Sequence, residues 1–148
     1  MTIRNEGRMP GLFLEDLSVG QSAQLTRAVT EADIVAFAAV TGDTNPVHLD
    51  ADYAATTAFG ERIAHGMLSA GYISAVLGTT LPGPGAVYLS QSLNFKRPVK
   101  IGAEVVAKVT VAAIDAAKAR VTLATVCQVN GKTVVDGEAV VLVPRKVA

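Results

Sequence analysis

The sequence predicts an α+β domain in which one antiparallel sheet curls around a single apolar helix. Helical periodicity dominates the first half of the chain, whereas apolar and polar residues alternate with a period of two in the second half. The longest helical segment, residues 67–81, is apolar on nearly every side. Because such a helix is normally buried, we expect the strands that follow it to provide its cover.

The first third of the chain is predicted to contain a lead-in, a strand and a capped helix. Residues 1–11 contain glycine and proline and are typical of a flexible lead-in, and the weak alternation of residues 21–29 favours a strand. Thr30 with Asp33 three positions later forms a weak capping box, which predicts a helix start. Gly42 is expected to end this helix.

Two further helices are predicted before the strands of the second half begin. Asp50 is a candidate N-cap for a short helix that Gly60 stops. The long apolar helix at residues 67–81 ends abruptly at residues 82–85, which read Pro-Gly-Pro-Gly.

The second half of the chain predicts an antiparallel meander of about four strands. The alternating segments are residues 87–95, 104–114, 121–129 and 133–143. Asn130-Gly131 is a strong hairpin signal, and residues 115–118 form a second turn candidate. One sheet covers only one side of the apolar helix, so we expect a second copy of the chain to cover the rest, as a homodimer.

Composition excludes several classes of function. The length of 148 residues favours one domain spanning residues 1–148. Lys+Arg and Asp+Glu both number 13, so the chain shows no charge signature for nucleic acid or an anionic membrane. Without an apolar run of membrane-spanning length or a signal segment, the chain is expected to be cytoplasmic. Cys127 lies in an alternating apolar segment and is expected in the core; with only two histidines besides, we expect no metal site.

The segment at residues 42–48, Gly-Asp-Thr-Asn-Pro-Val-His, is the strongest functional signal. It places the carboxylate of Asp43 five residues before the imidazole of His48, in a region rich in turn-forming residues. We expect an irregular loop that aims both side chains at one point inside an apolar cleft. An acid and an imidazole that share one water can add or remove water next to a carbonyl group.

The same segment resembles the hydratase-2 motif of (R)-specific enoyl-CoA hydratases, the MaoC-like family. Residues 63–67 (Ile-Ala-His-Gly-Met) and 94–99 (Asn-Phe-Lys-Arg-Pro-Val) are also similar to that family. The resemblance implies a hot-dog fold and a dimer with active sites near the subunit interface. It further implies hydration of trans-2-enoyl-CoA to (R)-3-hydroxyacyl-CoA, with no metal and no bound cofactor.

The resemblance also implies roles for individual residues. Asp43 and His48 are the expected acid–base pair, with Asp43 favoured as the base. Gly66 begins the apolar helix, where backbone N–H groups are free, and the resemblance makes its N–H the donor to the thioester oxyanion. Asn45 is either a turn former or an orienter of Asp43. His65, beside Gly66, is expected to fix the loop by hydrogen bonds.

Four more residues are candidates with open alternatives. Ser74 is expected to hydrogen-bond Asp43, as the resemblance implies, or to bond back to the carbonyl of its own helix. Leu77 lies on the same face and either walls the acyl tunnel or packs in the core. Lys96 and Arg97 either meet the phosphates of coenzyme A or form an ordinary solvated face.

Three rival functions compete with the hydratase hypothesis. A hot-dog dehydratase acting on 3-hydroxyacyl-carrier protein typically pairs its histidine with a glutamate from another helix, so the spacing of Asp43 and His48 argues against it. A thioesterase of this fold would need a carboxylate on the long helix, and residues 67–81 contain none. A non-catalytic acyl-thioester binder has no use for an acid–base pair. Acyl chain length and pathway, polyester synthesis or fatty-acid oxidation, stay open.

Overall fold

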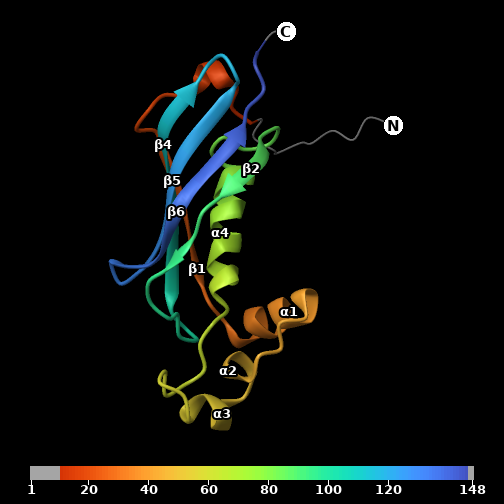
Figure 1. Ribbon diagram of the computed structural model, residues 1–148, viewed down its shortest axis with the longest axis vertical. Coiled ribbons are helices and arrows are strands. Elements are labelled where there is room, and N and C mark those ends of the chain that lie inside the picture. Colours follow the sequence, from red (N-terminus) through yellow and green to blue (C-terminus); the bar gives the residue numbers. More distant parts are fainter. Residues whose placement is uncertain (1–10, 147–148) are drawn as a thin grey trace.

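The structure, a computed structural model, describes residues 11–146 as a curved antiparallel sheet with one long helix against it (Figure 1). Apart from Gly11, the predicted lead-in therefore lies outside the described residues. In chain order the elements are β1 (Ser22–Ala28), α1 (Glu31–Thr41), α2 (Pro46–Leu49), α3 (Ala51–Ala55), α4 (Gly66–Thr79), β2 (Val87–Gln91), β3 (Asn94–Phe95), β4 (Glu104–Asp115), β5 (Arg120–Val129) and β6 (Lys132–Leu142).

The sheet confirms the α+β prediction and corrects one strand. Its order is β1-β4-β5-β6-β2, so β4, β5 and β6 form the expected meander. Residues 87–95 form two strands, β2 and β3, which both pair with β6 and not with β4. The strand is interrupted at Ser92. The carbonyl oxygen of Ser92 comes so close to Gly137 that a Cβ at position 137 would lie only 1.8 Å from it. Only glycine fits at position 137, where the Ser92 amide also donates to the Glu138 carbonyl at 2.9 Å.

Both predicted hairpin turns are present. Asn130 and Gly131 have positive φ values of 51° and 77°, the conformation that a two-residue hairpin turn between β5 and β6 requires. Between β4 and β5, the carboxylate of Asp115 accepts a hydrogen bond from the Lys118 amide at 3.1 Å. Local turn chemistry therefore sets the register of the central strands.

The caps of the short helices follow the sequence signals, but one predicted loop is helical. Thr30 and Asp33 form a reciprocal capping box at the start of α1, and Gly42 ends that helix with a φ of 79°. The prediction of an irregular loop over residues 42–48 is wrong for its second half, because Pro46–Leu49 forms a turn of helix. The Asn45 side chain caps it by accepting from the Val47 amide at 3.1 Å, with proline in the next position.

Helix α4 lies against the sheet with one face open. Its buried residues Tyr72, Ile73, Val76 and Leu77 belong to the core cluster with side chains of β4, β5 and β6. The opposite face is an exposed stripe at helical spacing, made of Met67, Gly71, Ser74 and Gly78. The sheet therefore covers one side of the helix, as predicted, and the prediction that a second copy covers the other side stays a prediction. None of the helices in residues 11–146 is long and apolar enough to span a bilayer.

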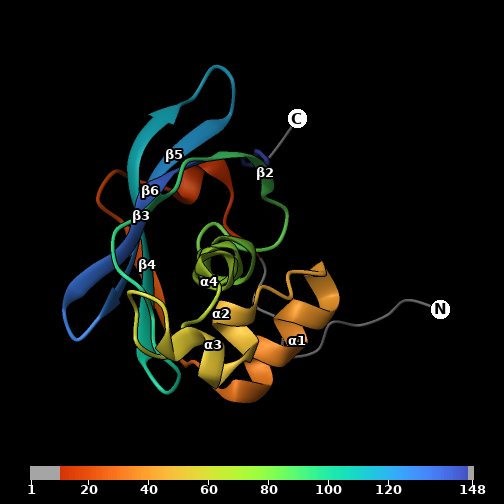
Figure 2. The same cartoon turned by 60° about the horizontal axis from the view of Figure 1, so that its bottom comes forward.

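The three short helices gather at the N-terminal end of α4 (Figures 1 and 2). This arrangement brings the segment after α1 close to the residues that precede α4. The predicted functional segment at residues 42–48 thereby meets the second predicted motif, residues 63–67.

Candidate active site

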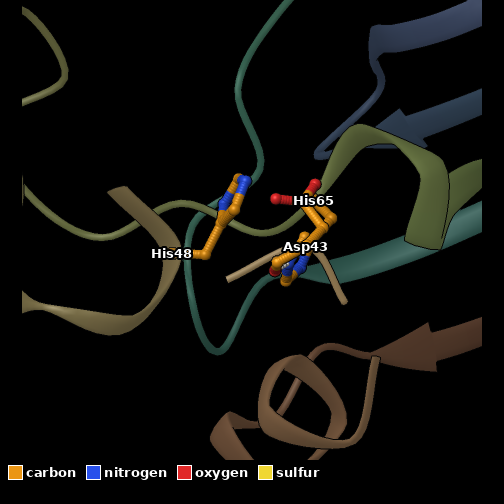
Figure 3. A group of neighbouring side chains, drawn as sticks. All are labelled: Asp43, His48 and His65. Carbon is orange, nitrogen blue, oxygen red and sulfur yellow. Dashed lines mark hydrogen bonds between the residues drawn. The ribbon is translucent and has the colours of Figure 1, made fainter. Parts of the chain in front are cut away.

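Three titratable side chains come together at this meeting point. Asp43 lies in the turn after α1, His48 on α2 and His65 immediately before α4 (Figure 3). One ligand-type atom from each residue lies within 4.8 Å of the other two. The sequence prediction that Asp43 and His48 converge is confirmed, and the structure adds the second histidine.

The turn that carries Asp43 is held by a set of short-range bonds. Its amide donates to the Thr41 hydroxyl at 3.1 Å, and its carboxylate accepts from the Asn45 amide at 3.3 Å. Asn45 thus caps α2 with its side chain and contacts the Asp43 carboxylate through its backbone amide, and a role of its side chain in orienting Asp43 stays a prediction. Asp43 itself is exposed in the single chain, and the expected apolar cleft does not enclose it.

His48 is buried and held in one tautomer. Its Nδ1 lies 2.7 Å from the carbonyl oxygen of Ile63, which can only accept, so Nδ1 carries the proton and Nε2 keeps the free lone pair. The backbone carbonyl of His48 accepts from Arg62 Nε at 2.8 Å. Arg62 also pairs with Glu31 of α1 at 2.7 Å. The sequence did not indicate Arg62, because its partners are distant in the chain.

The cluster has the composition of a metal site but not the geometry. Two histidines that each bond a backbone carbonyl, together with a carboxylate, are common metal ligands. However, the rings of His48 and His65 stack with centroids 3.8 Å apart and planes 28° apart. The lone pairs of the two rings therefore lie in nearly parallel planes, so the rings would have to leave the stack to point at one ion. The geometry favours a bound water or substrate over a metal.

A pocket of about 340 Å³ lies beside His48. It is mostly apolar, and its lining includes His48, Phe59, Gly66, Ser69, Phe95 and Val135. The Gly66 N–H begins α4 and has no acceptor among residues 11–146. A free amide at a helix N-terminus favours negative charge on a ligand.

The absence of a side chain on Gly66 shapes this pocket. A Cβ at that position would lie 2.7 Å from the ring carbons of Phe95. The Phe95 ring thus covers the start of α4 while itself being 55% exposed. Its role in the pocket was not predicted, although the motif at residues 94–99 contains it.

The remaining predicted residues divide into two groups. Lys96 and Arg97 line the pocket, and Arg97 also donates to the Thr133 carbonyl at 2.6 Å. Ser74 is exposed on the open stripe of α4 and makes no hydrogen bond to Asp43 within the described chain. Leu77 is buried in the core and borders a separate small cavity of about 70 Å³.

Comparison with known proteins agrees with the fold and the motif. The family described as MaoC like domain matches residues 17–133. An (R)-specific enoyl-CoA hydratase of Rhodospirillum rubrum is 57% identical over 134 residues, which cover 90% of this chain and 93% of that protein. A 3-hydroxybutyryl-CoA dehydratase of Methylorubrum extorquens is 54% identical, covering 91% of this chain and 86% of that protein.

Two solved structures of hydratases also resemble this chain. The unliganded R-hydratase PhaJ1 from Pseudomonas aeruginosa superposes with a TM-score of 0.87 and 51% identity, covering 92% of this chain and 88% of that one. The (R)-hydratase from A. caviae, described as involved in PHA biosynthesis, gives a TM-score of 0.86 at 49% identity. The match covers 88% of this chain and 99% of that one. With a hot-dog fold and this motif, the chain belongs to the MaoC-like domain family.

Proposed function

We propose that this chain is an (R)-specific enoyl-CoA hydratase, which converts trans-2-enoyl-CoA to (R)-3-hydroxyacyl-CoA without a metal or cofactor. The observation that carries the proposal is the convergence of Asp43 and His48 beside a pocket lined by Gly66. The activities named for relatives at 49–57% identity support the same reaction.

Asp43 and His48 are suited to hold one water. An ionised carboxylate and the Nε2 lone pair of His48 are both acceptors, and a water molecule offers one proton to each. The water oxygen then keeps a lone pair for attack on C3 of the enoyl group. We assign Asp43 as the base that takes a proton as the C3–O bond forms. His48 holds the water through its second hydrogen, which stays on the new C3 hydroxyl. The proton taken by Asp43 then moves through Nε2 of His48 to C2, which restores both groups.

Attack at C3 moves an electron pair onto the thioester oxygen and creates an enolate. The free N–H of Gly66 is the proposed donor to this oxygen, assisted by the partial positive charge at the start of α4. A donor of this kind typically contributes about 10²–10³ in rate. The enolate collapses when C2 is protonated, and the product leaves as the 3-hydroxyacyl thioester.

The rest of the substrate is assigned to the residues around the pocket. We place the coenzyme A phosphates near Lys96 and Arg97, at the rim of the pocket. Leu77 is proposed to border the end of the acyl chain, which would then have to reach the small cavity that Leu77 lines together with Ser74.

The proposal includes a homodimer of one-domain subunits in the cytoplasm. Its support is the open stripe of α4, which borders a groove of about 460 Å³ that Met67, Ser74, Tyr88 and Leu89 help to line. A second copy on this face would cover apolar surface and could also shield Asp43. A role of Ser74 toward Asp43 would then cross the subunit boundary. Use of the product in polyhydroxyalkanoate synthesis is part of the same proposal, supported by the A. caviae relative.

The proposal is tested by following the ultraviolet absorbance of crotonyl-CoA and analysing the chirality of the product. A hydratase bleaches the conjugated enoyl thioester and yields (R)-3-hydroxybutyryl-CoA. Bleaching only with a crotonyl-carrier protein would instead identify a carrier-protein dehydratase. No bleaching with crotonyl-CoA, a longer enoyl-CoA or the carrier-protein substrate would contradict the proposal and favour a binding role.

A further inference from the structure

His65 has no part in the proposed chemistry, yet its ring is buried and contacts Asp43, His48 and Phe37. It is only 2% exposed and lies at the junction of three elements. It precedes Gly66 directly, so it stands next to the proposed oxyanion donor. Its ring contacts both members of the proposed acid–base pair, and this double contact is the basis of the inference.

The first contact is a hydrogen bond to the turn that carries the carboxylate. Nε2 of His65 lies 2.9 Å from the backbone carbonyl oxygen of Asp43. A carbonyl oxygen only accepts, so Nε2 carries the proton and donates it. The bond joins residues that are 22 positions apart. It therefore fixes the turn at Asp43 to the start of α4 directly, independently of the bonds within the turn.

The second contact is a stack with the other imidazole. The His48 ring lies on one side of His65 at a centroid distance of 3.8 Å. Phe37 of α1 also contacts the His65 ring, with centroids 4.7 Å apart and planes 49° apart. The His48 ring is thus held at its edge by the Ile63 carbonyl and at its face by His65.

The remaining nitrogen of His65, Nδ1, makes no hydrogen bond in the described chain that would explain why this residue is an imidazole. Nδ1 is buried and has no partner among the described residues. Buried polar atoms are normally paired, and an unpaired one destabilises the fold. A phenyl ring would pack in the same place without this cost. The choice of an imidazole over a phenyl ring is therefore explained by its Nε2–H, which bonds the turn of Asp43, and its flat face in addition stacks on His48.

We propose that His65 is a positioning residue that sets the separation of Asp43 and His48, bonding the turn of one and stacking on the ring of the other. This inference rests on the proposed hydratase function. Because a displacement of about 1 Å in a reacting group can cost about 10²-fold in rate, loss of either contact lowers kcat. Neither contact involves Phe95, Lys96 or Arg97, which line other parts of the pocket, so KM is expected to change little.

Two substitutions separate the two contacts. His65→Gln keeps an amide N–H near the position of Nε2 but removes the flat ring. His65→Phe keeps the ring and removes the donor. We expect each to lower kcat for enoyl-CoA hydration by about 10- to 100-fold, with KM within about threefold of wild type. The control is Tyr72→Phe on α4, the helix that follows His65. It removes another buried polar atom without a partner and is expected to leave kcat unchanged.

A double-mutant comparison separates positioning from a purely structural role. In the Asp43→Asn background, a residue that acts through Asp43 has little left to contribute, so His65→Phe should lower kcat by less than about threefold further. Thermal stability, in contrast, should change by the same amount in both backgrounds. Single variants within about twofold of wild-type kcat, or full additivity of the two kcat losses, would overturn the inference.

A measurement without substrate keeps the inference distinct from the proposed function. The chain has two histidines, so ¹⁵N spectra of the labelled, untagged protein contain two imidazoles. At mildly alkaline pH we expect opposite tautomers, Nδ1–H for His48 and Nε2–H for His65. In His65→Phe, the His48 ring should show broadened or shifted signals.

If the tautomers are as expected but no enoyl-CoA is hydrated, the hydratase proposal fails and the positioning role of His65 does not. An Nδ1–H tautomer for His65, or an unchanged His48 in His65→Phe, overturns the positioning role.

Discussion

Nδ1 of His48 donates a hydrogen bond to the carbonyl oxygen of Ile63 across 2.7 Å, and this bond leaves Nε2 as the reactive nitrogen. His48→Asn places an amide N–H where Nδ1 stood and removes Nε2. The variant should therefore fold with near wild-type stability while its kcat falls by about 10²–10⁴-fold. His48→Ala should lose activity and also stability, by about 1–3 kcal/mol, because the Ile63 carbonyl loses its donor. Hydration kinetics and thermal melts measure the two effects, and an active His48→Asn would contradict the assignment.

Gly66 provides a separate test of the proposed oxyanion donor. A side chain at this position would displace the Phe95 ring, which is mostly exposed and free to move, so Gly66→Val should still fold. It should block the approach of the thioester and lower kcat by about 10²–10³-fold. The control is Gly66→Val combined with Phe95→Ala, which removes the clash. Restored activity in the double variant would show that Phe95, and not the amide, explains the loss.

The sequence predicts the parts of this site that depend on local chemistry. The turn at Asp43, the caps at Thr30 and Asp50 and the Asn130-Gly131 hairpin all follow from residues within a few positions of one another. The pairing of β2 with β6 and the stacking of His48 on His65 do not, because they join segments that only the folded chain brings together. The helical turn of α2 was predictable from Asn45 and Pro46, but the turn residues around it obscured the signal.

The capping box of α1 predicts a pH-dependent contribution to stability. The Thr30 backbone amide, and secondarily its hydroxyl, lowers the pKa of Asp33 from its ordinary value of 3.8. A carboxylate whose folded pKa is depressed stabilises the fold above its unfolded pKa, and this contribution is lost as the pH falls below 3.8. Thr30→Ala should cost about 1 kcal/mol at neutral pH. Denaturant unfolding at neutral and acidic pH measures both effects, and Asp33→Asn should remove the acid-dependent part.

Cys127 should be inert in the folded protein. It is fully buried among core residues, and burial raises the pKa of its thiol to about 12. The reactive thiolate is therefore scarce at mildly alkaline pH. We expect a thiol reagent such as DTNB to label Cys127 only after denaturant unfolds the chain. Rapid labelling of the native protein would show that the core around β5 opens readily.

The most direct test of the account is the rate of crotonyl-CoA hydration by the wild type, Asp43→Asn, His48→Asn and the double variant. If Asp43 and His48 hold one water as a unit, each single substitution loses most of the activity and the double variant is hardly slower than the worse single one. The product of the wild type is (R)-3-hydroxybutyryl-CoA. Single losses that multiply in the double variant, or an Asp43→Asn protein with wild-type rate, would contradict the shared-water site.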